Sequence, residues 1–145
     1  MSTHIKLVAV FADNTLGQMA RITGVLEQAG VNIRWMTIAT SETFGVIKLL
    51  LDRPAAAARA LRAAGYSVTL VPVLAIEIRD RPGGLHTVAR VLAENKVNVD
   101  NSSGFVIESR RSAVVLIEVK DWARARRVLR RCAIPTLAAR DLQNL

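Results

Sequence analysis

The sequence is poor in cysteine, in aromatic residues and in long apolar runs. Its single cysteine, Cys132, excludes a disulfide within one chain. Aromatic residues make up 4% of the 145 residues, so the core must be built from Val, Ile, Leu and Ala. No apolar run approaches the ~18 residues of a membrane-spanning helix, and the N-terminus has no signal-peptide pattern. We therefore expect no membrane association and a location in the reducing cytoplasm.

The sequence also lacks the residue patterns of common catalytic and metal sites. His4 and His86 have no metal-ligand spacing to Cys132 or to an acidic cluster. There is no G-x-x-x-x-G-K-[S/T] loop for nucleotide phosphates, and no Ser/His/Asp set stands out. Cys132 falls on the apolar stripe of a predicted helix, which predicts a buried, inert thiol. We expect neither an enzyme, nor a metal site, nor a cofactor.

One stretch, in contrast, occurs twice. Residues 14–19 read N-T-L-G-Q-M and lead through a helical pattern to V-N-I at 31–33. Residues 80–85 read D-R-P-G-G-L and lead through a similar pattern to V-N-V at 97–99. The offset is 66 positions, from Gly17 to Gly83. Because this period is longer than the repeat unit of a solenoid, we predict two fused domains of one type, 1–71 and 72–145.

Apolar periodicity predicts the same order of elements in both domains. Period-two alternation predicts strands, and i, i+3, i+7 spacing predicts amphipathic helices. The predicted strands are 5–11, 31–40, 44–51, 67–79, one within 97–108, 112–119 and 136–139, and the predicted helices follow residues 16, 54, 84 and 121. Residues 67–79 are expected to be extended throughout, as the last strand of the first domain running into the first strand of the second, with Pro72 breaking the ladder between them. The order βαββαβ, twice, predicts an α+β fold of two tandem ferredoxin-like units, whose antiparallel sheets carry helices on one face.

The loop that contains the glycine, residues 14–19 in the first copy and 80–85 in the second, is the part of the motif that can bind a ligand. A helix N-terminus presents unpaired N–H groups and a partial positive charge, so it can hold a carboxylate without a cationic side chain. Gly17 and Gly83 allow a ligand to approach the backbone closely. Asn14 and Asn32 flank the first helix and offer amide donors and acceptors. This pattern fits a free amino acid, although the glycine could simply form a turn and Asn32 could fasten the turn after the helix.

The two stretches, 14–33 and 80–99, resemble the ACT domain, as tandem copies over nearly the whole chain. The family pattern is an acidic or amide residue, any residue, proline, glycine and an apolar residue, then a helix and V-N-I. The resemblance is closest to small stand-alone tandem ACT proteins, and it implies a regulatory module that binds an amino acid where two domains pair. The ligand contacts that it implies are Asn14, Leu16, Gly17, Gln18, Met19, Asn32 and Ile33, and in the second copy Asp80, Pro82, Gly83, Gly84, Leu85, Asn98 and Val99.

Two departures from the family pattern predict unequal sites. Leu16 stands where proline is usual, which loosens the first loop. Asp80 stands where the first copy has Asn14, and a carboxylate suits an ammonium group but repels another carboxylate. We favour the first copy as the ligand site.

Several partners follow from these features. Sheets with open edges tend to pair, which predicts a homodimer, and the resemblance implies control of an amino-acid metabolic enzyme on a separate polypeptide. A partner subunit without its own ligand remains an alternative. The net charge of +8 and the arginines of residues 122–132 also leave open RNA binding on the sheet. However, RNA-reading sheets carry base-stacking aromatics, and residues 114–119 contain none, so we do not expect nucleic acid.

Overall fold

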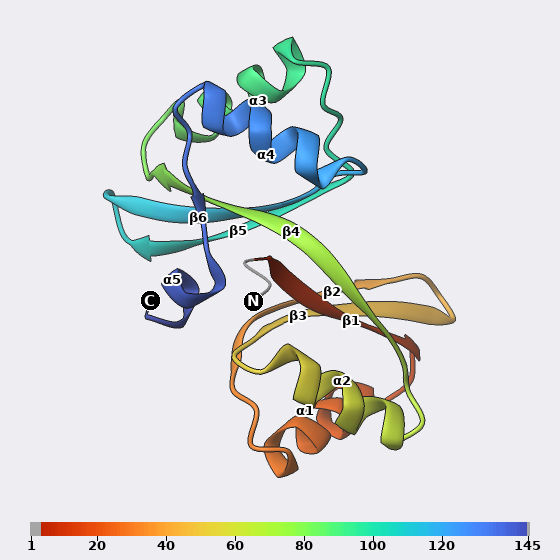
Figure 1. Cartoon of the computed structure of the whole chain (residues 1–145). Helices are drawn as coiled ribbons and strands as arrows, with labels where there is room; N and C mark the ends of the chain where they lie inside the picture. The colour runs from red at the N-terminus through yellow and green to blue at the C-terminus, as the bar shows by residue number, and fades with distance from the viewer. Residues whose placement is uncertain (1–3, 145) are drawn as a thin grey trace. The chain divides into compact units, whose positions relative to one another are not determined.

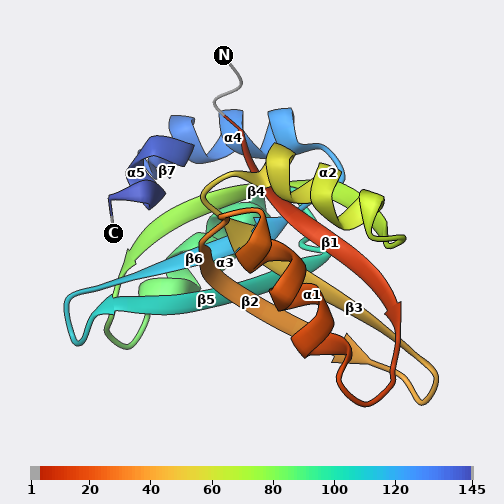
Figure 2. The same cartoon turned by 90° about the horizontal axis from the view of Figure 1, so that it is seen from below.

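The computed structural model describes residues 4–144 and arranges them as two βαββαβ units (Figure 1). The first unit comprises Lys6–Val71, and the second comprises the chain from Pro72 together with His4 and Ile5. Within each unit the strands pair antiparallel and the two long helices cover one face of the sheet (Figures 1 and 2). The predicted α+β fold of tandem ferredoxin-like units is therefore confirmed.

The first unit has the strand order β2-β3-β1-β4. Its elements are β1 (Ile5–Asp13), α1 (Gln18–Gln28), β2 (Ile33–Thr40), β3 (Phe44–Leu51), α2 (Pro54–Ala63) and the first part of β4 (Ser67–Arg79). Alternate residues of the strands face the helices, and the core that they form is wholly aliphatic at its centre. Val10, Leu26, Leu49 and Leu61 are completely buried there. The loop between β1 and α1 is tied to the turn between β2 and β3 by the Asn14 backbone amide, which donates to the Thr43 carbonyl at 3.1 Å.

The second unit repeats the order as β5-β6-β4, with β7 on the other side of β4. Its elements are the second part of β4, α3 (Gly84–Glu94), β5 (Asn101–Glu108), β6 (Ser112–Glu118), α4 (Trp122–Arg131), β7 (Thr136–Leu137) and α5 (Ala139–Gln143). Its core has the same aliphatic character, with Ile76, Leu92, Val115 and Leu129 buried. One long strand, β4, thus contributes to both units.

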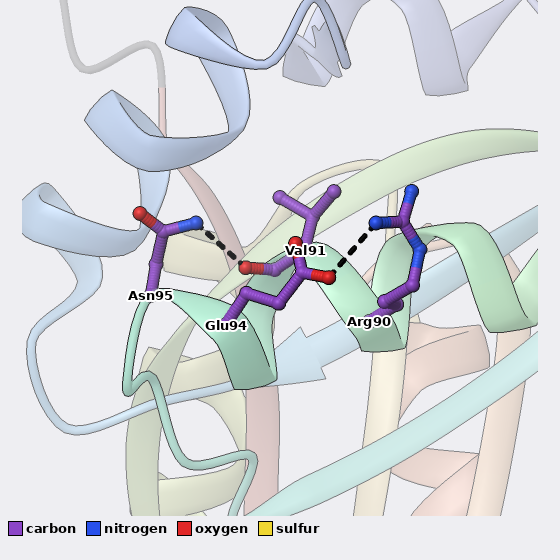
Figure 3. Close-up of polar contacts among 4 residues, drawn as sticks. All are labelled: Arg90, Val91, Glu94 and Asn95. Atoms are coloured by element: carbon purple, nitrogen blue, oxygen red, sulfur yellow. Dashed lines mark hydrogen bonds and ion pairs between the residues drawn. The ribbon is translucent and has the colours of Figure 1, made fainter.

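The first helix of each unit ends in the same way, although the residues differ. Gly30 has φ +66° after α1, and Lys96 takes the equivalent left-handed turn with φ +55° after α3. The side chain of Asn95 supports this turn by donating from Nδ2 to the Val91 carbonyl at 2.8 Å (Figure 3). Arg90 and Glu94 form an exposed ion pair of 2.9 Å on the same last turn (Figure 3). After α3, Asn95 and Lys96 therefore end the helix in the way that Gly30 does after α1.

An arginine from a neighbouring helix also binds the carbonyl groups at the C-terminal end of α1 and of α3. Arg53 donates from Nη2 to the carbonyls of Ala29 at 2.8 Å and Gly30 at 2.6 Å. Arg124 donates in the same way to the carbonyls of Asn95 at 2.7 Å and Lys96 at 3.3 Å. Each arginine comes from the start of the neighbouring helix and neutralises the negative end of the helix dipole.

The stretch 67–79 forms one continuous extended strand, β4, in which Pro72 is exposed, and β5 lies within the expected 97–108. Three details of the sequence interpretation are wrong. The strand β2 begins at Ile33, two residues later than expected, and the expected strand 136–139 is only two residues long, followed by α5. Cys132 is exposed, because it lies just beyond the last turn of α4, where the buried stripe has ended at Leu129.

Candidate functional site

The first glycine loop connects β1 to α1. Gly17 takes a left-handed conformation, with φ +80°, and is itself the N-cap of α1. The loop is closed by the Thr15 amide, which donates to the Asp13 carbonyl at 2.9 Å, and by the Gln18 amide, which donates to the Thr15 carbonyl at 3.2 Å. No side chain caps the helix by a hydrogen bond.

This geometry leaves backbone donors open at the start of α1. Within residues 4–144, no oxygen accepts a hydrogen bond from the amides of Gly17, Met19 and Ala20. These are the donors that every helix start leaves unpaired unless a side chain or ligand satisfies them. They also lie at the positive end of the helix dipole, so they favour an anionic group such as a carboxylate.

The open amides border a hollow of about 390 Å³, the first-loop hollow. Its lining combines the loop and helix start with the ends of three strands: Ala12, Asp13, Asn14, Thr15, Leu16, Gly17, Gln18, Met19, Ala20, Ile38, Thr40, Gly45 and Ile47. Leu16 is fully exposed, Met19 is 50% exposed and Ile38 is 43% exposed. The hollow therefore pairs open N–H groups with an apolar wall that nothing in the first unit covers.

Three side chains hold the loop in shape. Gln18 Oε1 accepts from the Tyr66 hydroxyl at 3.0 Å and from Arg21 Nε at 3.3 Å. Arg21 also donates to the Leu16 carbonyl at 3.3 Å and to the Thr15 hydroxyl at 3.2 Å. A Cβ at Gly17 would lie 3.2 Å from Arg21 Nη1, the end of an exposed side chain that can shift, so the loop needs glycine there mainly for its left-handed φ.

Asn14 and Asp80 anchor the two loops to the neighbouring hairpins. Asn14 donates from Nδ2 to the Ser41 carbonyl at 3.1 Å, in the turn between β2 and β3. Asp80 accepts from the Arg110 amide at 2.6 Å, in the turn between β5 and β6. Because the hairpins present groups of opposite polarity, one copy uses an amide donor and the other a carboxylate.

The second glycine loop has a different hollow, the second-loop hollow, of about 630 Å³. Gly83 is the N-cap of α3, with φ +86°, and a Cβ at Gly84 would collide with the Arg79 carbonyl oxygen. Pro82, Gly83 and Gly84 line this hollow, together with Glu77, Ile78, Arg79, Arg81, Thr87, Val88 and residues 133–135. Charged side chains thus stand beside apolar ones in this lining, in contrast to the first-loop hollow.

Comparison with known proteins identifies the fold family. A family model described as the ACT domain pair matches residues 3–145. The chain belongs to the ACT domain pair family. ACT domains are a family of amino-acid-binding regulatory domains, so the family supports a regulatory rather than a catalytic role.

Solved structures agree with this ACT domain pair assignment. Protein BT0572 from Bacteroides thetaiotaomicron is 26% identical, with 99% of this chain and 98% of that chain covered and a TM-score of 0.91. The regulatory subunit of aspartate kinase from Thermus thermophilus, in a ligand-free form, is 15% identical, with 88% and 91% covered and a TM-score of 0.63. The corresponding Thermus flavus subunit is 15% identical, with 89% and 90% covered and a TM-score of 0.59. No curated protein matches in sequence.

The fold of this ACT domain pair separates the predicted contacts into two groups. Asn14 and residues 16–19 meet in the first-loop hollow, and residues 82–84 line the second-loop hollow. Asp80 and Leu85 do not line it. The remaining predicted residues, Asn32, Ile33, Asn98 and Val99, follow the far ends of α1 and α3 and line neither hollow.

The distance along the helix explains this separation. An 11-residue helix such as α1 is about 16 Å long at 1.5 Å per residue. The Asn32 amide donates to Asp52 Oδ1 at 2.9 Å, and the Asp52 amide donates to the Asn32 carbonyl at 3.2 Å. The backbone of Asn32 thus fastens the turn after the helix, while its side chain is exposed. Within one ACT unit, Asn32 and the glycine loop cannot touch the same small ligand.

Sequence reasoning missed the strand residues of the first-loop hollow. Ile38, Thr40 and Ile47 come from β2 and β3 and form part of its wall. Their alternation within predicted strands placed them on one face, but the motif around Gly17 carries no information about which strand ends lie beside it.

Other chemistries find no support in the described part of this ACT domain pair. Residues 4–144 contain no cluster of three or more His, Cys, Asp or Glu side chains that could hold a metal ion. None of the helices in this range is long and apolar enough to cross a membrane.

Proposed function

We propose that this ACT domain pair is a regulatory module that binds a free amino acid with an aliphatic side chain in the first-loop hollow. The ligand carboxylate accepts from the open amides of Gly17, Met19 and Ala20. Its side chain lies against the apolar wall, which includes Ile38 and Ile47. The observation that carries the proposal is this junction of unpaired N–H groups and uncovered apolar surface in a hollow of about 390 Å³, the size range of a small-ligand site.

The site is completed by a second copy of the chain in this proposal. One unit binds the carboxylate end of the ligand, but the side-chain oxygen of Asn32, Oδ1, which would accept from the ligand ammonium, lies at the other end of α1. A partner molecule can present its own Asn32 to the hollow and also cover Leu16, which is fully exposed here. Large apolar side chains left open to water commonly mark such interfaces. The module is therefore a homodimer with the ligand at the contact.

The second copy of the motif has a different role. Its larger second-loop hollow is lined by Glu77, Arg79 and Arg81 as well as by apolar residues, so it suits an aliphatic side chain less well. We assign ligand binding to domain 1, residues 1–71. Domain 2, residues 72–145, has a structural role in this proposal and is joined to domain 1 through the shared strand β4.

The regulated partner is an enzyme of amino-acid metabolism on a separate polypeptide, in the cytoplasm. Two structural relatives are regulatory subunits of aspartate kinase. These relatives support the class of partner and not its identity.

A thermal-shift panel of the twenty amino acids tests the proposal. A ligand at about 100 times its Kd adds roughly 2.7 kcal/mol to stability, so valine, leucine or isoleucine should raise the Tm by several degrees. Gly17→Val should abolish this shift, because its side chain would occupy the space before the amides. The matched control is Gly83→Val, which places the same change in the second loop and should keep the shift.

Two results would refute the assignment. If no amino acid raises the Tm of the wild-type protein, the module has no amino-acid ligand and the alternative of a ligand-free partner subunit stands. If Gly17→Val keeps the shift while Gly83→Val loses it, the ligand lies at the second loop instead.

A further inference from the structure

Gly45, at the second position of β3, leaves one point in the wall of the first-loop hollow without a side chain. It is buried and lines the hollow. Its φ lies outside the left-handed region, so the backbone does not require a glycine at this position. A glycine inside a strand weakens the strand, and it often marks a place that a ligand or another backbone approaches closely. The missing side chain at residue 45 is therefore best explained by the space that it leaves.

The atoms nearest to this space all belong to the flanking strands. In the sheet, Gly45 pairs with Ala12 of β1 on one side and with Thr40 of β2 on the other. A Cβ at Gly45 would lie 3.2 Å from Thr40 Cγ2, and 3.7 and 3.8 Å from the carbonyl oxygens of Ala39 and Ala12. None of these three atoms comes from α1 or from the loop before it. An added side chain would therefore enter the hollow rather than the body of the helix.

The second unit has larger residues in the same row of its sheet. There Ile78 of β4 pairs with Ala113 of β6, and Ala113 pairs with Val106 of β5. Ile78 packs against the core of that unit, where the first unit has only Ala12. Among residues 4–144, none from β5 or β6 lines the second-loop hollow. The contribution of the neighbouring hairpin strands to a hollow is thus a property of the first unit alone.

An apolar row follows the Gly45 row on the same face of the sheet. Ile47 of β3 pairs with Ile38 of β2, and both residues line the first-loop hollow. Each lies two residues along its strand from the Gly45 row, which corresponds to about 7 Å. A ligand side chain of several carbons can lie over Gly45 and reach Ile38 and Ile47. A side chain of one carbon leaves the apolar row without a contact.

We infer that Gly45 determines the size of the amino-acid side chain that the first-loop hollow accepts, and that it favours the four-carbon side chains of leucine and isoleucine over that of alanine. The inference rests on the proposed function and adds the residue that discriminates among aliphatic ligands. The open amides hold the carboxylate, which all amino acids share, so they cannot make this distinction. The space over Gly45 and the row beyond it can.

A single added methyl group tests this inference. One methylene more or less in a hydrophobic pocket changes discrimination about 10–200-fold. Gly45→Ala should therefore raise the Kd for leucine and isoleucine at least about tenfold and change the Kd for alanine much less. The measured quantity is the ratio of the affinity for leucine to that for alanine, obtained by calorimetric titration. We expect this ratio to fall about tenfold in Gly45→Ala.

Two further variants separate the effect of size from an effect on folding. Gly24→Ala adds the same methyl group in α1, where a Cβ has no neighbour within 4 Å and does not line the hollow, so the ratio should not change. Gly45→Ala together with Thr40→Ser removes the 3.2 Å contact with Thr40 Cγ2 and so relieves the crowding. This double variant should fold as the wild type does and still lose its preference for leucine, whereas Thr40→Ser alone should keep it.

The possible negative results distinguish this inference from the proposed function. A wild-type protein that binds no aliphatic amino acid contradicts both. A wild-type protein that binds leucine, combined with an unchanged leucine-to-alanine ratio in Gly45→Ala and in the double variant, leaves the proposed function intact and refutes the role of Gly45. An equal loss of affinity for leucine and alanine in the double variant also refutes it, because Gly45 would then support the shape of the site without selecting the size of the ligand.

Discussion

Asn14 and Asp80 occupy the same place in the two repeats, yet they perform opposite hydrogen-bonding roles. Asn14 donates to a carbonyl, and Asp80 accepts from an amide. From the sequence, this difference predicts a difference in ligand preference, because a carboxylate repels a carboxylate. In the structure both side chains are engaged in holding their loops to a hairpin, which gives an alternative reason for each residue type. A residue can thus match a binding motif and still be explained by the turn next to it.

The glycines of the second loop make a prediction at the same scale. Gly83→Ala should cost about 1–2 kcal/mol, because an L-residue is strained at its left-handed φ of +86°. Gly84→Ala should cost more, although its φ is ordinary, because the new Cβ collides with the fixed Arg79 carbonyl and the backbone must shift. Urea unfolding of both variants measures the order. A Gly84→Ala protein as stable as the wild type would contradict the close approach.

At the scale of elements, the repeated arginine contact is the least expected feature. Arg53 and Arg124 each reach back to the carbonyl end of the preceding helix. Arg53→Met should lower the free energy of unfolding by about 1 kcal/mol, which is typical of a lost hydrogen bond to a charged donor at an exposed site. Arg59→Met, on the exposed side of α2, serves as the control and should change stability little. Equal stability of the two variants in urea unfolding would refute the role of Arg53.

The periodicity of apolar residues predicted most of the helices and strands, but it predicted their first and last residues less accurately. The apolar stripes of α1 and α3 and the strand alternation depend on neighbouring residues, so they are legible in the sequence. The arginine contacts join residues 23 to 29 positions apart, and only the packed fold brings them together. The start of α5 is different, because Asp141 accepts from the Ala138 amide only three positions away, a local contact that the sequence interpretation missed. The buried thiol predicted for Cys132 failed because the helix ends at Arg131, one residue before it.

At the scale of the whole molecule, the internal repeat was the strongest signal. It predicted two units of one fold, and the resemblance to the ACT domain located the loop that starts the first helix of each. Neither could predict the walls of the first-loop hollow, since Ile38 and Ile47 lie 21 and 30 positions beyond Gly17 in the chain. Asn32, which the motif includes, lies at the far end of α1 from the first glycine loop. This separation is the reason for proposing that a second copy of the chain completes the site.

The wall residues provide a prediction about the assembled site. Ile38→Glu should reduce affinity for an aliphatic amino acid by tenfold or more, because a carboxylate would replace part of the apolar wall beside the ligand side chain. The fold should survive, since Ile38 is 43% exposed. Val106→Glu is the matched control, an exposed strand position of the second unit at 55%. Calorimetric titration with leucine compares them, and equal affinity in both variants would place the ligand elsewhere.

The most direct measurement is a crystal structure of the protein grown with a mixture of the twenty amino acids. The account predicts one aliphatic amino acid per chain in the first-loop hollow, with its carboxylate within hydrogen-bond distance of the Gly17, Met19 and Ala20 amides and its ammonium beside Asn32 of a second copy. A structure in which the chain's own side chains fill this hollow, or in which the ligand occupies only the second loop, would contradict it.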